Sequence, residues 1–109
     1  MTHDALLGLL GLGARGGRVV LGVDGTRAAL QREECNLVVL AADASPRAVE
    51  KVVRLARAKG ATLVAGPEAE LLGSRLGRPP VMVVGVKDRA LAKGILAIAT
   101  AAKGPDGGQ

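Results

Sequence analysis

The sequence of 109 residues contains no phenylalanine, tyrosine or tryptophan. RNA-recognition motifs and oligonucleotide-binding barrels stack bases on aromatic rings, so both of these binding modes are excluded. The chain is nevertheless basic, because 15 Lys and Arg residues against 10 Asp and Glu residues give a net charge of +5. This charge favours a polyanionic partner, and the alternative is a basic surface that only contacts solvent. Without aromatic rings, nucleic acid would be bound through phosphates, backbone amides and shape.

Cysteine and histidine each occur once, as Cys35 and His3. One cysteine permits no internal disulfide, and these two residues cannot assemble a Cys/His zinc site, so we expect no metal. Cys35 follows two glutamates, whose charges discourage formation of a thiolate, so we expect it to be inert. Ser45 and Thr26 have no histidine to serve as a base, because the single histidine lies at the end of the chain. Nucleophilic catalysis is therefore not expected.

Long apolar runs are also absent, since no stretch approaches the roughly 18 residues of a membrane span. The first four residues carry none of the positive charge that is typical of an export signal, so we expect a cytoplasmic protein without membrane contacts. The length is typical of one domain, and 49% hydrophobic with 23% charged residues is a globular composition. We expect a single domain over residues 1–103 and a disordered tail over 104–109.

The spacing of apolar residues predicts helices that alternate with strands. The run Leu37–Ala41 is typical of a central strand that is covered on both faces, and positions 23, 26, 29 and 30 have helical spacing. Ser45 and Pro46 mark the start of another helix, and Asp88 caps the last one. The pattern predicts an α/β fold, a three-layer α/β/α sandwich around a sheet of about four strands. The predicted helices are 2–13, 23–32, 46–59, 68–76 and one from 88, and the predicted strands are 19–21, 37–41, 62–65 and 81–86.

Two patterns of enzymes and signalling proteins are present only in part. The stretch Gly11–Gly16 has the spacing of a dinucleotide-binding fingerprint, but that motif requires a strand before it and a helix after it, the reverse of the order here. We expect no cofactor and no small-molecule substrate. Asp43 and Asp88 follow strands, where acids can be catalytic or accept a phosphoryl group. A receiver domain needs a further pair of acids after its first strand, where only Asp24 is present, so both residues are expected to cap the following helix or turn.

Arginines gather around two segments that are shaped by glycine. The first is a short strand that turns at Gly22 into a helix, and such a corner exposes N–H groups to anions. The second is the loop that extends from Gly77 to Pro80. Two such loops on one edge of the sandwich would grip a bent RNA, because guanidinium forks and exposed amides suit phosphates. The arginines that flank the two segments are Arg15, Arg18, Arg27, Arg75 and Arg78.

Several stretches together, over roughly residues 5–98, resemble a known superfamily. They are Leu9–Leu12 with Arg15, Arg18–Gly22, Leu37–Ala41 with Asp43–Ser45, Leu72–Gly73, Leu76–Gly77, and Val81–Val86 with Asp88, Ala92 and Lys93. In their order and spacing the sequence is similar to the kink-turn-binding ribosomal proteins of the L-seven-Ae and L-thirty-e type, and most of all to the bacterial YlxQ-like branch. The resemblance implies an α/β/α sandwich that performs no catalysis, binds kink-turn or other structured RNA, and takes part in translation. Ribosomal RNA is the natural target, with ribosomal or ribosome-assembly proteins as partners.

The superfamily contacts RNA through a Gly-x-Asn-Glu-x-Thr-Lys turn after the first strand and through the loop before the last strand. Asp24, Gly25 and Ala28 replace the asparagine, glutamate and lysine of that pattern, which removes the side chains that read bases. Arg27 lies one residue before the lysine position, about 100° around the helix, so we expect it to contact a phosphate and not the same base edge. The alternative is a protein-interaction or scaffold module of the same fold that has lost RNA specificity. The resemblance implies RNA contacts at Gly22, Asp24, Gly25, Thr26 and Arg27, and at Gly77, Arg78, Pro79 and Pro80.

Overall fold

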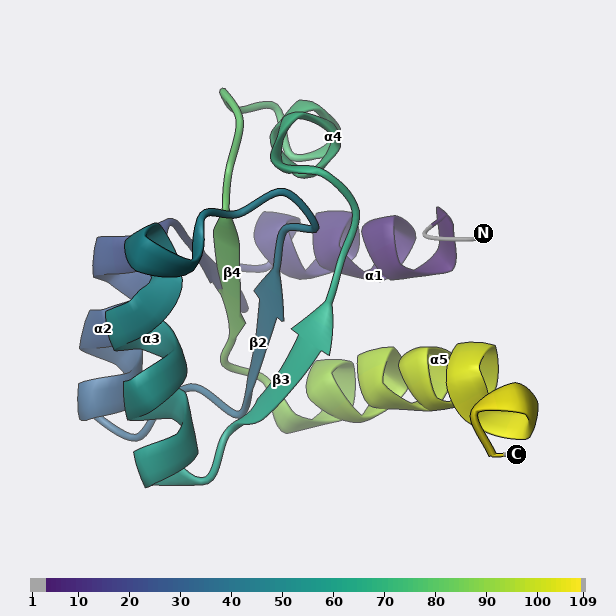
Figure 1. Ribbon diagram of the computed structural model, residues 1–109. Helices are drawn as coiled ribbons and strands as arrows, with labels where there is room; N and C mark the ends of the chain where they lie inside the picture. The colour runs from purple at the N-terminus through teal and green to yellow at the C-terminus, as the bar shows by residue number, and fades with distance from the viewer. Residues whose placement is uncertain (1–3, 109) are drawn as a thin grey trace.

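The computed structural model describes the backbone of residues 4–108 and the side chains of residues 4–99. Helices and strands alternate along the chain, as the spacing of apolar residues predicted (Figure 1). The elements are α1 (Asp4–Arg15), β1 (Val19–Leu21), α2 (Val23–Gln31), β2 (Leu37–Leu40), α3 (Pro46–Lys59), β3 (Thr62–Ala65), α4 (Ala69–Arg75), β4 (Val83–Val86) and α5 (Arg89–Gly108).

The four strands form one sheet in the order β1-β4-β2-β3. β2 is parallel to β3 and antiparallel to β4, and β4 is antiparallel to β1. The register sets Leu40 of β2 beside Val83 of β4, and Leu21 of β1 beside Val84. β2 and β4 are therefore the inner strands, which explains why both are rich in buried valine and leucine. The prediction of a central strand at 37–41 is confirmed, with Ala41 just outside β2.

Helices cover both faces of the sheet, so the predicted α/β/α sandwich is confirmed (Figure 1). α2 and α3 pack on one face around a cluster that includes Leu30 and Val52. α1, α4 and α5 pack on the other face around a cluster that includes Leu10 and Ile95. All four of these side chains are fully buried, and each such burial contributes roughly 1.5–3 kcal/mol. The two clusters thus supply most of the favourable free energy of folding.

Glycine at position 85 of β4 allows α2 to approach the sheet closely. A Cβ atom there would lie 2.9 Å from Cγ2 of Val20, 3.1 Å from Cγ2 of Thr26 and 3.2 Å from Sγ of Cys35. Packed interiors have no room for such an addition, so a larger residue would push α2 outward. Gly85 therefore fixes the position of the first turns of α2.

The start of β4 and the capping of α3 differ from the prediction. β4 begins at Val83 rather than at 81, because the N–H of Val81 bonds to the carbonyl of Ala69 at 3.0 Å and ties this residue to α4. Ser45 precedes α3 as expected, yet its side chain makes no capping hydrogen bond. Pro46, with its fixed φ, is the first residue of α3, as predicted.

The two terminal helices also extend beyond their predicted ends. α1 continues to Arg15, and residues 2 and 3, where its start was expected, lie outside the described residues. Asp88 caps α5 as predicted, since its Oδ2 accepts a hydrogen bond from the N–H of Leu91 at 2.8 Å. α5 then runs to Gly108 through most of the segment predicted as a disordered tail. The alanine-rich stretch before that segment favours continuation of the helix, and residue 109 lies outside the described residues.

Candidate nucleic-acid interface

The turn at Gly22 joins the end of β1 to the start of α2. Gly22 has a φ of 91°, in the left-handed region that glycine adopts readily, and its N–H donates to the carbonyl of Val83 at 2.8 Å. Its own carbonyl accepts a hydrogen bond from the N–H of Thr26 at 3.2 Å and so begins the helix. Among the described residues no side chain caps α2. The N–H groups of its first turn, with the positive end of the helix dipole, are therefore available to an anion.

The loop between α4 and β4 lies at the same end of the sheet as this turn. The loop leads directly into Val83, the residue that receives the hydrogen bond from Gly22. β1 and β4 are antiparallel neighbours, so the end of one strand meets the start of the other. The structure therefore brings the two segments together, as the expectation of a shared edge required.

The path of this loop is fixed by contacts with the end of α4. The N–H groups of Gly77 and Arg78 bond to the carbonyls of Ser74 at 3.1 Å and of Gly73 at 2.8 Å, the two bonds of a Schellman motif. Gly77 has the left-handed φ, 71°, that this motif needs. A Cβ at position 73 would lie 2.6 Å from the carbonyl carbon of Pro79, so the loop packs on the bare backbone of Gly73.

Three arginines line one pocket of ≈ 480 Å³ beside β1, which we call the arginine pocket. Arg15 comes from the last turn of α1, Arg75 from the last turn of α4, and Arg78 from the loop. Among residues 4–99 the ion pairs are Arg54–Glu50 and Lys59–Glu33, so no acidic side chain neutralises these three arginines. Uncompensated guanidinium groups suit phosphate oxygens. The other residues that line the pocket are Gly11, Ala14, Val19, Leu21 and Leu76.

The same pattern, Arg-x-Gly-Arg, ends α1 at residues 15–18 and α4 at residues 75–78. In the first copy the N–H groups of Gly17 and Arg18 bond to the carbonyls of Ala14 at 3.2 Å and of Gly13 at 2.8 Å, which is again a Schellman motif. Each copy thus places an arginine in the last helical turn and a left-handed glycine two residues later. This repeat is the signal in the sequence that could have predicted the arginine pocket. The small and apolar residues that line the pocket were not predicted.

Arg18 lies away from Gly22, contrary to the expectation that it brackets the turn. Its carbonyl accepts a hydrogen bond from the N–H of Lys87 at 2.8 Å, beside the opposite end of β1. Gly22 follows Arg18 by four residue steps along extended chain, a distance of about 13 Å. Arg27 lies in the second turn of α2, the helix that begins directly after Gly22, and its side chain is half-buried. Of the five predicted arginines, Arg18 alone is placed at the far end of β1.

The other predicted contact residues differ in exposure. Asp24 is exposed, as are Gly77, Pro79 and Pro80, whereas Gly25 is half-buried. Thr26 is 0% exposed, and its Oγ1 has no hydrogen-bond partner among the described residues. A fully buried side chain cannot contact an RNA, so the expectation for Thr26 was wrong: it packs beside Gly85.

The residues considered for catalysis have structural roles. Asp43 was expected to cap the helix or turn that follows it. Instead, its Oδ1 accepts a hydrogen bond from the N–H of Ala69 at 2.8 Å and holds the start of α4. Cys35 donates from Sγ to the carbonyl of Leu37 at 3.3 Å. Burial raises the pKa of the Cys35 thiol, and contacts with the backbone of Leu37 and Val86 offset part of this shift. Within the described part of the chain, no group of three or more His, Cys, Asp or Glu residues is placed to hold a metal ion.

The described residues include no helix with the length and hydropathy to cross a membrane. A search of curated proteins finds no match to the sequence. Among solved structures, the chain is similar to a protein with unknown function from Bacillus halodurans, with 27% identity over 85% of this chain and 94% of that chain and a TM-score of 0.80. Its fold is also similar to that of a 15.5kD RNA binding protein from Giardia lamblia, with 24% identity over 92% of this chain and 86% of that chain and a TM-score of 0.77.

The comparison with family models covers most of the chain. The model described as ribosomal protein L7Ae/L30e/S12e/Gadd45 family matches residues 4–95, from the first turn of α1 into α5. The match therefore includes both the turn at Gly22 and the loop before β4. It also agrees with the superfamily that the sequence resembles. The chain belongs to the ribosomal protein L7Ae/L30e/S12e/Gadd45 family.

Proposed function

We propose that this chain is a non-enzymatic RNA-binding protein that holds structured RNA through the turn at Gly22 and the loop from Gly77 to Pro80. The observation that carries the proposal is that the arginine pocket and the start of α2 adjoin neighbouring residues at the end of β1. Leu21 lines the arginine pocket, and the next residue, Gly22, opens the uncapped N-terminus of α2. Amide N–H groups and guanidinium groups both bind phosphate oxygens, so a bent RNA backbone that passes over the end of β1 can contact both.

The chemistry of the turn favours recognition of RNA shape over recognition of bases. Asp24, Gly25 and Ala28 carry no side chain that repeats the base contacts of the superfamily pattern. Phosphate contacts then supply the affinity, and the fit of a bent RNA supplies the selectivity. We propose kink-turn or ribosomal RNA as the target, a YlxQ-like role in translation, a cytoplasmic location, and ribosomal or ribosome-assembly proteins as neighbours. Membership of the family and the fold shared with the RNA binding protein from Giardia lamblia support this proposal.

The test compares two variants with an equal change of charge. Arg75→Glu/Arg78→Glu reverses two arginines of the arginine pocket, and Arg47→Glu/Lys51→Glu makes the same change on the exposed face of α3. Binding to a fluorescent kink-turn RNA and to a ribosomal RNA fragment is measured between about 50 and 200 mM salt. We expect the first variant to bind about 100-fold more weakly with a smaller salt slope, and the second to stay within about threefold of the original protein.

The outcomes separate the proposal from its alternatives. Equal losses in the two variants would move the RNA site to α3. Absence of salt-sensitive binding at micromolar protein concentration would support the alternative of a protein-interaction or scaffold module. Thermal melting of each variant distinguishes lost binding from lost folding, and crosslinking to cellular RNA followed by sequencing identifies the natural target.

A further inference from the structure

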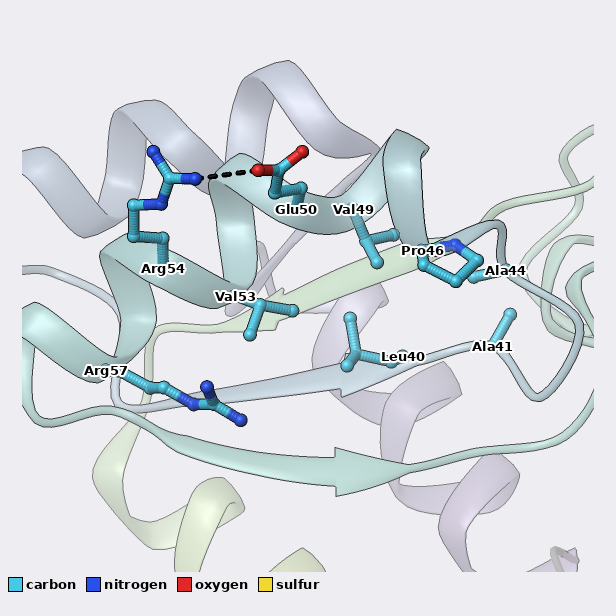
Figure 2. Close-up of a pocket in the computed structure, with 9 residues that line it drawn as sticks. All are labelled: Leu40, Ala41, Ala44, Pro46, Val49, Glu50, Val53, Arg54 and Arg57. Atoms are coloured by element: carbon cyan, nitrogen blue, oxygen red, sulfur yellow. Dashed lines mark hydrogen bonds and ion pairs between the residues drawn. The ribbon is translucent and has the colours of Figure 1, made fainter.

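A hollow of ≈ 540 Å³ lies between α3 and the sheet, and it shares no lining residue with the arginine pocket. Its apolar lining includes Leu40, Val49 and Val53, and its charged residues include Arg54 and Arg57. Figure 2 shows Leu40 on β2 and Val53 on α3 facing each other across the hollow, with Arg57 at one end. We call this hollow the α3 groove.

Beside the groove, α3 leaves the neighbouring face of β3 partly uncovered. Leu63 packs in the cluster beneath α3, and Ala65, two residues further along β3, shares the same face of the sheet. Ala65 lies beside Leu40 in the register, yet it is exposed, and Leu63 is only half-buried. In contrast, Val52, near the centre of α3 on its inner face, is fully buried. Apolar surface therefore remains at this edge of the molecule.

β3 is also an edge strand with hydrogen-bonding groups that β2 does not use. The N–H of Thr62 bonds to the carbonyl of Asn36 at 3.2 Å, and the N–H of Gly66 bonds to the carbonyl of Leu40 at 2.8 Å. In a parallel strand, the backbone N–H and C=O groups of every second residue point toward the partner strand. Since those of Thr62 and Gly66 point toward β2, those of Leu63 and Ala65 point away from it. The four residues of β3 include no charge and no proline, the usual means of blocking an edge.

The charges around the groove favour an acidic occupant. The exposed surface of α3 carries five basic residues and the single acidic residue Glu50. Arg54 pairs with Glu50 at 2.7 Å, and Lys59 pairs with Glu33 at 3.2 Å. Arg57 forms no ion pair among residues 4–99, so its guanidinium is available at the end of the groove. The basic residues of α3 are Arg47, Lys51, Arg54, Arg57 and Lys59.

We propose that an extended acidic peptide of another protein adds to β3 as a further strand, inserts an aliphatic side chain into the α3 groove, and places a carboxylate at Arg57. Backbone hydrogen bonds to Leu63 and Ala65 supply affinity, and the groove selects the side chain. RNA is a poorer occupant, because the lining is mostly apolar and has no aromatic ring on which bases stack. β3 and β1 are opposite edges of the sheet, so this surface is separate from the proposed RNA site and does not depend on it.

The experiment begins with a displayed library of random decapeptides that is selected against the whole protein. We expect enriched peptides to alternate acidic and aliphatic residues. In NMR spectra, the amide signals of Leu63 and Ala65 should shift when such a peptide binds, and their hydrogen exchange should slow. Ala65→Pro removes an outward N–H that the fold does not use, and Arg57→Gln removes the unpaired charge. Each is expected to weaken binding about fivefold, the equivalent of one hydrogen bond.

The matched control is Arg89→Gln on α5, which packs on the other face of the sheet and should leave peptide binding unchanged. Melting temperatures show that each variant is folded, and Arg57→Gln keeps the test valid if the proline disturbs β3. The proposal is overturned if no peptides are enriched over a parallel selection against Ala65→Pro, or if neither variant weakens their binding. Displacement of the peptides by a single-stranded RNA would assign the groove to nucleic acid instead.

Discussion

Asp43 links the segment after β2 to the start of α4, 26 residues further along the chain, since its Oδ1 accepts a hydrogen bond from the N–H of Ala69 at 2.8 Å. Ala69 is the first residue of α4, and its carbonyl accepts the N–H of Val81 at 3.0 Å. The carboxylate after β2 therefore holds α4, and α4 holds the end of the loop that precedes β4. Part of the candidate RNA interface is positioned by a side chain from another segment of the chain.

Removal of this carboxylate should loosen α4. Asp43→Ala is expected to lower the free energy of unfolding by about 1 kcal/mol, as for the loss of a helix cap, when measured by urea denaturation. Asp43→Asn is the control, because its amide oxygen still accepts a hydrogen bond. This variant should keep more than half of the free energy of unfolding that Asp43→Ala loses. An Asp43→Ala protein as stable as the original would show that the contact does not stabilise α4.

A side chain at position 73 should displace the loop before β4. In Gly73→Ala the new Cβ would meet the backbone of Pro79, with a carbonyl carbon 2.6 Å away, and a backbone atom cannot rotate aside. We expect a loss of roughly 1–3 kcal/mol in the free energy of unfolding, and weaker binding of kink-turn RNA. Gly8→Ala is the matched control, because a Cβ on this exposed helical glycine meets nothing within 4 Å and should stabilise α1. Equal stability of the two variants would contradict the packing described for the loop.

Glu33 is held in a conformation that suits glycine. It has a φ of 60°, and the hydrogen bonds around it end α2. Glu33→Gly is expected to raise the free energy of unfolding by about 0.5–1 kcal/mol, because the left-handed strain is removed. Loss of the exposed ion pair with Lys59 offsets part of this gain. Glu34 has no positive φ, so Glu34→Gly relieves no strain and should not stabilise the protein. A larger gain in Glu34→Gly than in Glu33→Gly would show that the backbone of Glu33 is not strained.

Local signals in the sequence predicted most of the fold, because helix period, strand period and end residues act over a few positions. Pro46 and Asp88 bound helices as expected, and the spacing of residues 23, 26, 29 and 30 placed Thr26 in the core stripe of α2. The resemblance suggested an RNA contact for Thr26, and the helical period was the better guide. Contacts such as Asp43 with Ala69 depend on tertiary packing, which no local pattern encodes. Arg18 was misplaced because a strand carries the chain away from Gly22.

Cys35 should resist modification while the protein is folded. Burial raises the pKa of its thiol, so the reactive thiolate is disfavoured. The folded state holds the thiol proton more tightly than the unfolded chain does. This contribution to stability is therefore full below the pKa of the unfolded thiol and is lost as the pH rises through the pKa of the folded thiol.

The measurement for Cys35 is the rate of labelling by a thiol-reactive disulfide at about pH 8, with and without urea. We expect slow labelling that follows unfolding, and a smaller alkaline loss of stability in Cys35→Ala. Labelling of the folded protein as fast as that of the unfolded chain would contradict the burial of the thiol.

The turn at Gly22 should gain base recognition when the three residues that depart from the superfamily pattern are replaced. Asp24 is exposed, and a Cβ at Gly25 would lie 3.7 Å from Cβ of Val20, an ordinary contact, so the helix accepts the change. Asp24→Asn/Gly25→Glu/Ala28→Lys restores an amide donor, a carboxylate acceptor and a cation, and each good base contact contributes about 1–3 kcal/mol of discrimination. We expect at least about tenfold tighter binding of kink-turn RNA than of a straight duplex, relative to the original protein. Ala48→Lys adds the same net charge on α3 and should tighten both RNAs equally. A triple variant that also tightens both RNAs equally would show that only its charge matters.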